Sequence, residues 1–93
     1  MVIRGHRTIE KFTRKHANAR KALARFVTLA EQAEWKHFPD VKNTFPATDY
    51  VPESGTLIFD VGGNNYRITA RVDFDLQTMW VDSVQTHAEY DKE

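Results

Sequence analysis

The segment 57–74 constrains the fold more than any other part of the sequence, because it has the pattern of a β-hairpin. Two stretches rich in β-branched and aromatic residues, 57–61 and 66–74, flank the sequence Gly62-Gly63-Asn64-Asn65. Glycine and asparagine tolerate the positive φ angles of tight hairpin turns, so this cluster predicts the turn. In the second stretch apolar residues alternate with polar ones, which predicts a strand with one face in the core and one face outside it.

The polar face of that second predicted strand carries Arg67 and Arg71. A guanidinium stays protonated and can donate two parallel hydrogen bonds to phosphate oxygens. The pair therefore suits adjacent phosphates, or one phosphate bound twice. The alternative is that Arg67 is a solvated strand residue that forms an ion pair with Asp60 or Asp82, since surface ion pairs are common.

Helical periodicity dominates the first third of the chain. Gly5 is a permissive N-cap for a first helix, whose apolar stripe is thin and consists of Ile9 and Phe12 with Ala17. Asn18 marks the end of this helix and is the expected N-cap of a second one. That second helix has a fuller apolar stripe, formed by Ala19, Ala22, Leu23, Phe26, Val27, Ala30 and Ala33. Two helices joined by so short a link bury their stripes on a common partner, and the sheet is the candidate.

Four shorter elements complete the prediction. Residues 1–4 suit an edge strand and 79–86 a third strand of a meander, while 40–45 suit one helical turn and 48–51 a short strand. The sequence therefore predicts an α+β fold in which two N-terminal helices pack on a small twisted antiparallel sheet. With 93 residues and 41% hydrophobic content, the chain is expected to form a single domain, 1–93.

Charge is distributed unevenly along a chain whose formal net charge is zero. Residues 1–25 contain eight basic residues and one acid, for a net charge of +7, whereas residues 43–93 have a net charge of −6. The basic front end predicts that one surface meets a polyanion. The sequence has no cysteine and no apolar run of about 18 residues, and it has no signal-peptide pattern at its start, so we expect a cytoplasmic protein without a membrane partner.

Three motifs together resemble one known family. They are Asp40-Val41-Lys42-Asn43-Thr44-Phe45, Phe59-Asp60-Val61-Gly62-Gly63-Asn64-Asn65-Tyr66-Arg67, and Thr86-His87-Ala88-Glu89-Tyr90-Asp91. The chain resembles the HigB family of toxins from type II toxin–antitoxin modules, within the RelE/ParE superfamily. This resemblance implies a RelE-like toxin domain that cleaves mRNA in the ribosomal A site as an mRNA interferase, and a HigA-type antitoxin as its partner.

RNA cleavage without a metal needs groups that move protons and a group that stabilises charge on the phosphate. We expect the catalytic residues to be Arg67 for charge stabilisation, His87 for proton transfer, and Tyr90, which would share a face with His87 on one helical turn. The expected RNA-binding residues are Lys42, Asn64, Arg71 and Asp91. The residues expected to dock on the ribosome are Arg7, Lys11, Arg14, Lys15, Arg20 and Lys21.

Alternatives remain open at this point. His87 could be an N-cap or a surface histidine, and Tyr90 an aromatic that seals the core. His6, His16 and His37 lack the spacing of a metal pair, so we expect no metal and no cofactor. The chain also has Ile58 and Asp60 where the superfamily's better-known nucleases carry lysines, and it could be a toxin of the same fold with a protein target such as gyrase, or a non-catalytic interaction module.

Overall fold

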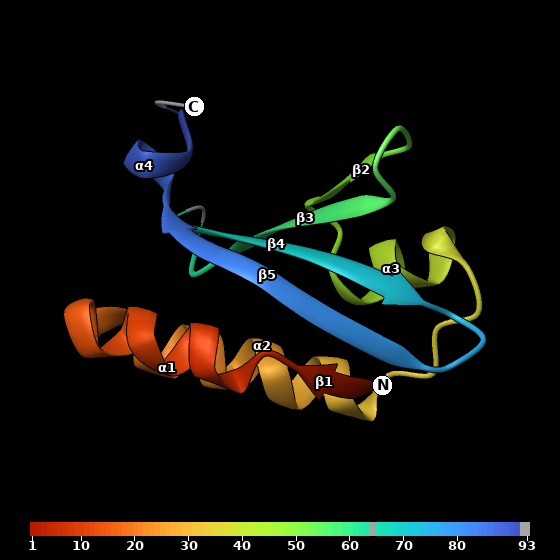
Figure 1. Cartoon of the computed structure of the whole chain (residues 1–93), viewed down its shortest axis with the longest axis horizontal. Helices are drawn as coiled ribbons and strands as arrows, with labels where there is room; N and C mark the ends of the chain where they lie inside the picture. The colour runs from red at the N-terminus through yellow and green to blue at the C-terminus, as the bar shows by residue number, and fades with distance from the viewer. Residues whose placement is uncertain (64, 92–93) are drawn as a thin grey trace.

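The computed structural model, which describes residues 1–63 and 65–91, has an α+β architecture (Figure 1). Its elements follow one another as β1 (Val2–Arg4), α1 (His6–Lys15), the 3₁₀ turn η1 (Ala17–Ala19), α2 (Arg20–Gln32), α3 (Phe38–Thr44), β2 (Thr48–Val51), β3 (Thr56–Val61), β4 (Tyr66–Asp73), β5 (Thr78–Thr86) and α4 (His87–Asp91). The strands form one sheet in the order β1-β5-β4-β3-β2. Helices α1 and α2 cover one face of this sheet, while α4 lies at one end of the other face (Figure 1).

The central hairpin forms as the sequence predicts. Strands β3 and β4 pair antiparallel up to Val61 and Tyr66, and Gly62 and Gly63 make the turn with φ angles of 67° and 62°. A Cβ atom on Gly62 would lie 2.9 Å from the ring of Tyr66. The backbone conformation and the close ring therefore both favour glycine at this position. Asn64 lies outside the described residues.

The sheet is mixed, so the expectation of a purely antiparallel sheet was wrong. Strand β1 is an edge strand as predicted, but it runs parallel to β5, with Ile3 opposite Met79. Both side chains are buried, at 5% and 0% exposure. A parallel pair of strands needs a long connection, and here most of the chain lies between β1 and β5. No local turn therefore sets the direction of β1, which follows from tertiary packing.

The two N-terminal helices pack on the sheet through their apolar stripes, and Leu23, Phe26 and Ala30 of α2 are buried. Asn18 was wrongly expected to be the N-cap of α2, because Asn18 lies within η1 and Ala19 is the N-cap. The backbone N–H of Ala19 donates to the carbonyl of His16 across 2.9 Å. This continuous turn satisfies backbone groups that a capping side chain would otherwise satisfy. It also leaves Ala17 exposed rather than in the stripe of α1.

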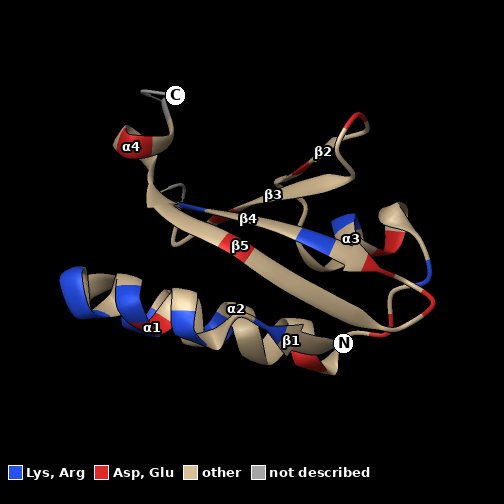
Figure 2. Cartoon of the chain, in the orientation of Figure 1, with Lys and Arg blue, Asp and Glu red and all other residues tan. Residues whose placement is uncertain are grey.

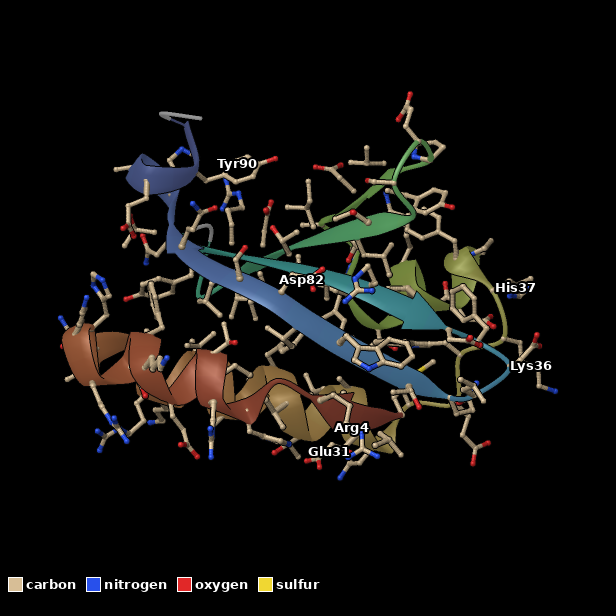
Figure 3. The ribbon with its side chains drawn as sticks, in the orientation of Figure 1. Arg4, Glu31, Lys36, His37, Asp82 and Tyr90 are labelled. Carbon is tan, nitrogen blue, oxygen red and sulfur yellow. The ribbon has the colours of Figure 1, made fainter. Side chains whose placement is uncertain are left out.

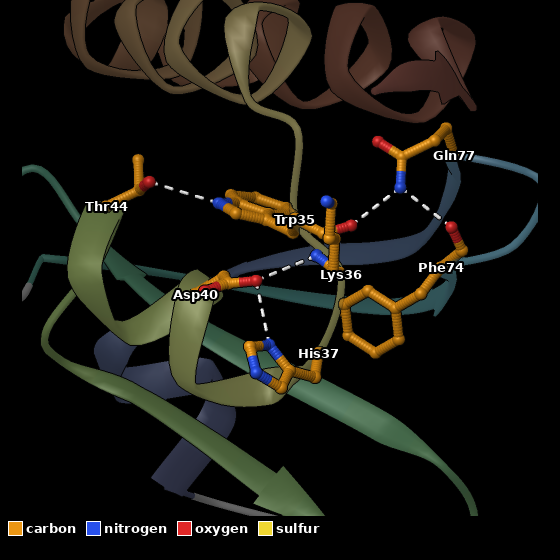
Figure 4. Close-up of polar contacts among 7 residues, drawn as sticks. All are labelled: Trp35, Lys36, His37, Asp40, Thr44, Phe74 and Gln77. Carbon is orange, nitrogen blue, oxygen red and sulfur yellow. Dashed lines mark hydrogen bonds and ion pairs between the residues drawn. The ribbon is translucent and has the colours of Figure 1, made fainter.

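The link between α2 and α3 is held by side-chain hydrogen bonds (Figure 4). Trp35 donates from Nε1 to the hydroxyl of Thr44 across 3.0 Å, and Nε2 of Gln77 donates to the carbonyl oxygens of Trp35 and Phe74. The carboxylate of Asp40 accepts from the backbone N–H of Lys36 and lies 2.8 Å from Nδ1 of His37. These bonds let α3 extend to seven residues, longer than the single turn expected from the sequence.

Aromatic rings fill the core between the helices and the sheet. Phe26 of α2, Phe45 and Trp35 all contact Phe59 of β3, with ring centroids between 5.0 and 6.5 Å apart. Because Phe59 faces this core, its neighbours Ile58 and Asp60 point to the opposite face of the sheet. Within the residues that the structure describes, no helix is both long enough and apolar enough to cross a membrane.

Candidate active site

Arg67 lies on the face of the sheet that α1 and α2 leave uncovered. Its neighbour Ile68 is fully buried on the helical side, so the alternation along β4 directs Arg67 to the open side. Arg67 is nevertheless only 8% exposed. The reason is that α4 follows directly after β5 and brings Tyr90 over this side of the sheet, away from α1 and α2 (Figure 3).

Four groups surround the guanidinium of Arg67. Its Nε atom forms an ion pair with the carboxylate of Asp60 at 2.9 Å, and its Nη1 atom donates to the carbonyl of Tyr66 at 3.3 Å. Its Nη2 atom lies 2.5 Å from Nδ1 of His87. The Cζ atom stands 5.8 Å from the centre of the Tyr90 ring, within the range of a cation–π interaction. The three residues expected to be catalytic are therefore brought together.

The contact with Arg67 fixes the roles of the two ring nitrogens of His87. A guanidinium can donate hydrogen bonds but cannot accept one. Nδ1 of His87 is therefore the acceptor in this pair, and the proton of the neutral ring resides on Nε2. The backbone N–H of His87 also donates to the carbonyl of Asn65 across 2.8 Å, which ties the start of α4 to the end of the hairpin turn.

A capping box begins α4, and this feature was missed in the sequence. The hydroxyl of Thr86 accepts a hydrogen bond from the N–H of Glu89 at 3.1 Å, and the carboxylate of Glu89 accepts from the N–H of Thr86 at 2.9 Å. The pattern Thr-x-x-Glu was visible and is a known start signal for helices. Because this capping role belongs to Thr86, His87 is not the N-cap.

The hydrogen bonds with Thr86 hold the pKa of the Glu89 carboxyl below its usual value, with a smaller contribution from the nearby charges of His16 and Lys15. These two residues belong to the end of α1 and the turn after it. Together with Glu89 they line a cleft of about 480 Å³ between α1 and α4. Glu89 of α4 therefore faces the end of α1 across this cleft, whereas Tyr90 points away from α1 (Figure 3).

Arg71 does not join Arg67 at one phosphate site. The two residues are four positions apart on β4, about 13 Å at the usual rise of a strand, so the expectation of one phosphate bound twice was wrong. Arg71 instead forms a two-pronged ion pair with Asp82, with both bonds at 3.0 Å. This pairing raises the pKa of Arg71 above its usual value, chiefly through the hydrogen bonds with the carboxylate.

The remaining expected RNA-binding residues are not part of the Arg67 cluster. Lys42 is exposed on α3, whose Val41 is buried. Asn64 lies outside the described residues, and Asp91 ends α4 with a side chain that the structure does not describe. The structure confirms the ion pair between Arg67 and Asp60 that was left open as an alternative, but Arg67 is buried rather than solvated.

The six residues expected to dock on the ribosome are all exposed on α1 and at the start of α2. Figure 2 shows basic residues along α1, on the far side of the sheet from α4. The catalytic candidates and the basic helices therefore occupy different faces of the molecule.

Comparison with known proteins identifies related sequences. Residues 19–93 match the model of the HigB toxin family, described as the RelE-like toxic component of a toxin–antitoxin system. The mRNA interferase HigB of Escherichia coli O6:H1 (strain CFT073) is 30% identical over 84 residues, which cover 89% of this chain and 82% of the relative. The mRNA interferase toxin HigB of Escherichia coli K12 is 39% identical over 54 residues, which cover 55% of this chain and 50% of the relative. The match covers α2, α3, α4 and the strands β2 to β5, and the chain therefore belongs to the HigB family of toxins from toxin–antitoxin systems.

Proposed function

We propose that this toxin is an mRNA interferase, a metal-independent endoribonuclease that cleaves messages in the A site of the ribosome and so inhibits translation. The observation that carries the proposal is the contact of Arg67 with both His87 and Tyr90 on the open face of the sheet. The relatives are named as mRNA interferases, which favours RNA over a protein target such as gyrase. The fold that we assign to this single domain is RelE-like.

The first step of the proposed reaction is an exchange of partners by Arg67. In the free protein Nη2 of Arg67 donates to the neutral ring of His87. A phosphate oxygen is a better acceptor for a guanidinium than a neutral nitrogen, because hydrogen bonds between opposite charges are stronger. When the scissile phosphate enters, Arg67 turns Nη2 to the phosphate and stabilises the charge that builds there.

The second step is proton transfer. In this step Nδ1 of His87 accepts the proton of the ribose 2′-OH. The 2′-oxygen attacks phosphorus, and the bond from phosphorus to the 5′-oxygen breaks. The hydroxyl of Tyr90 is a hydrogen-bond donor and supplies a proton to that leaving oxygen. Asp60 stays on Nε and orients the guanidinium throughout.

RNA and the ribosome are bound by residues outside this catalytic set. Lys42, Asn64 and Asp91 contact the message, with Asp91 orienting a base or a histidine. The exposed bases of α1 and α2 bind ribosomal RNA, since Arg and Lys side chains neutralise phosphates without reading sequence. Their separation from the Arg67 face allows docking and cleavage to use different surfaces.

Membership of a toxin–antitoxin family implies an antitoxin partner, and we assign it to the HigA type. The acidic second half of the chain would repel an acidic segment, whereas the basic helices would attract one. The antitoxin therefore binds α1 and α2 and blocks entry to the ribosome, leaving the Arg67 cluster uncovered.

The function is tested by expressing the chain without antitoxin and mapping RNA 5′ ends after a short induction. We expect growth arrest and new 5′ ends in translated messages, in phase with codons, and neither effect from the His87→Ala variant. Induction of the SOS response without new 5′ ends would instead indicate a protein target such as gyrase. The absence of any phenotype would indicate an interaction module.

A further inference from the structure

A second aromatic and basic cluster lies on the same open face as Arg67. Trp80 is a partly exposed residue of β5, between Met79 and Val81, which are buried on the helical side. The register of the sheet places Trp80 directly opposite Arg71 of β4. The Cζ atom of Arg71 stands 5.9 Å from the centre of the Trp80 ring, so that the guanidinium lies over the indole.

Asp82 holds Arg71 in this position. Its carboxylate accepts from Nε and Nη2 of Arg71 at 3.0 Å each, while the side chains of Arg71 and Asp82 remain 55% and 38% exposed. The carboxylate balances the charge of the guanidinium, so this cluster offers little net attraction to a phosphate. It offers planar groups instead, and the planes of aromatic rings and guanidinium groups are the surfaces on which unpaired bases stack.

The surface between the two clusters includes short hydroxyl side chains beside Ile58 of β3, which lies opposite Thr69. Thr69 of β4 lies opposite Ser83 of β5, and both face the open side between Arg67 and Arg71. Along β4 the two arginines are about 13 Å apart. A single-stranded RNA whose scissile phosphate lies at Arg67 can therefore reach Trp80 within a few nucleotides.

We propose that Trp80, with Arg71 held over it by Asp82, is a stacking site for one unpaired base of the message and positions the strand for cleavage at Arg67. This inference rests on the proposed function, because it assigns a contact of the same RNA substrate. Trp80 is a positioning residue in this account and takes no part in the proton transfers. The stacked nucleotide is not the one that is cleaved.

The test measures single-turnover cleavage of a ribosome-bound message as a function of toxin concentration. Trp80→Ala should raise the concentration for half-maximal rate about tenfold, in line with the loss of one stacked base, and leave the saturated rate unchanged. Trp80→Phe should retain most of the affinity because it keeps an aromatic ring. Trp80→Leu, which keeps an apolar side chain, should behave like Trp80→Ala and serves as the second variant should alanine unfold the chain.

Two further arms separate base stacking from other effects. Binding to ribosomes without a message should be the same for the wild type and Trp80→Ala. In messages with one abasic nucleotide, moved position by position, the difference between the two proteins should vanish at a single position. If the difference persists with every abasic message, or if Trp80→Ala and Trp80→Leu retain the wild-type concentration dependence, the stacking site is wrong while the proposed function stands. Failure of the wild type to cleave any ribosome-bound message overturns both.

Discussion

Nη2 of Arg67 lies 2.5 Å from Nδ1 of His87, although the two residues are 20 positions apart in the chain. The contact joins the second strand of the hairpin to the short C-terminal helix. This contact depends on the turn that leads into β4 and on the capping box at the start of α4. The chemistry that we propose for this site therefore depends on local structure at both places, and each part can be tested separately.

Removal of the Asp60 carboxylate should destabilise the fold. Asp60→Ala removes the carboxylate that pairs with Nε of Arg67, a residue that is only 8% exposed. We expect a loss of about 1–3 kcal/mol in the free energy of unfolding, the usual cost of a buried polar group that loses its partner, measured by urea denaturation. Asp82→Ala is the matched control and should hardly change stability, because its pair with Arg71 is exposed. Equal effects of the two variants would contradict the view that the pair of Asp60 with the buried Arg67 stabilises the fold.

The order of α4 should depend on pH through Glu89. Because the folded state lowers the pKa of Glu89, the capping box stabilises α4 at pH values above the ordinary range of a glutamate, and this stabilisation is lost as the pH falls below about 4. The protection factor of the Thr86 amide, its intrinsic exchange rate divided by its observed rate, should fall in that range before that of core amides such as Ile68. Glu89→Gln keeps an accepting oxygen and should remove this pH dependence. A Thr86 amide that stays equally protected from pH 7 to pH 3 would rule out the capping box in solution.

Docking on the ribosome should depend on the basic helices. We expect the double reversal Arg14→Glu and Arg20→Glu to weaken association with ribosomes and to make the salt dependence of binding less steep. Both side chains are exposed, so the melting temperature should change little. The control is the double reversal Arg4→Glu and Lys36→Glu, which removes equal charge elsewhere and should leave most of the affinity. Equal losses of ribosome affinity in the two double variants would show that binding depends on net charge and not on the surface of α1 and α2.

The position of the antitoxin can be read from hydrogen exchange of the toxin with and without its partner. Binding to the basic helices should protect amides between residues 4 and 25, because that surface is both exposed and strongly positive. The amides of residues 65–71 and 87–90 should change little. Protection confined to those two segments would instead indicate that the antitoxin covers the active site directly.

Much of this fold follows from local sequence patterns. The alternation of residues 66–74, the glycines of the turn and the apolar stripe of α2 predict elements that the structure contains, since each reflects a period fixed by backbone geometry. The parallel direction of β1 could not be predicted in this way. It is set by the burial of Ile3 against Met79, which are far apart in the sequence.

The sequence predicts three catalytic candidates that the structure brings into contact, but it does not predict how they are arranged, and their catalytic role stays a prediction. The sequence predicts that Arg67, His87 and Tyr90 act together, and the structure places them in contact. The sequence did not predict that Arg67 would be buried, because burial depends on α4 folding back over β4. The stacking of Arg71 on Trp80 was also missed, since it follows from strand register, which no local pattern reveals.

The central claim is that Arg67, His87 and Tyr90 cleave RNA, and its most direct test is the single-turnover rate of cleavage of a ribosome-bound message. Replacement of Arg67 by alanine should slow cleavage by about 10²–10³-fold, and replacement of His87 or Tyr90 by about 10²–10⁴-fold. His6→Ala, an exposed histidine on α1, is the matched control and should cleave at the wild-type rate. If the three alanine variants melt cooperatively and still cleave as fast as the wild type, the proposed active site is wrong.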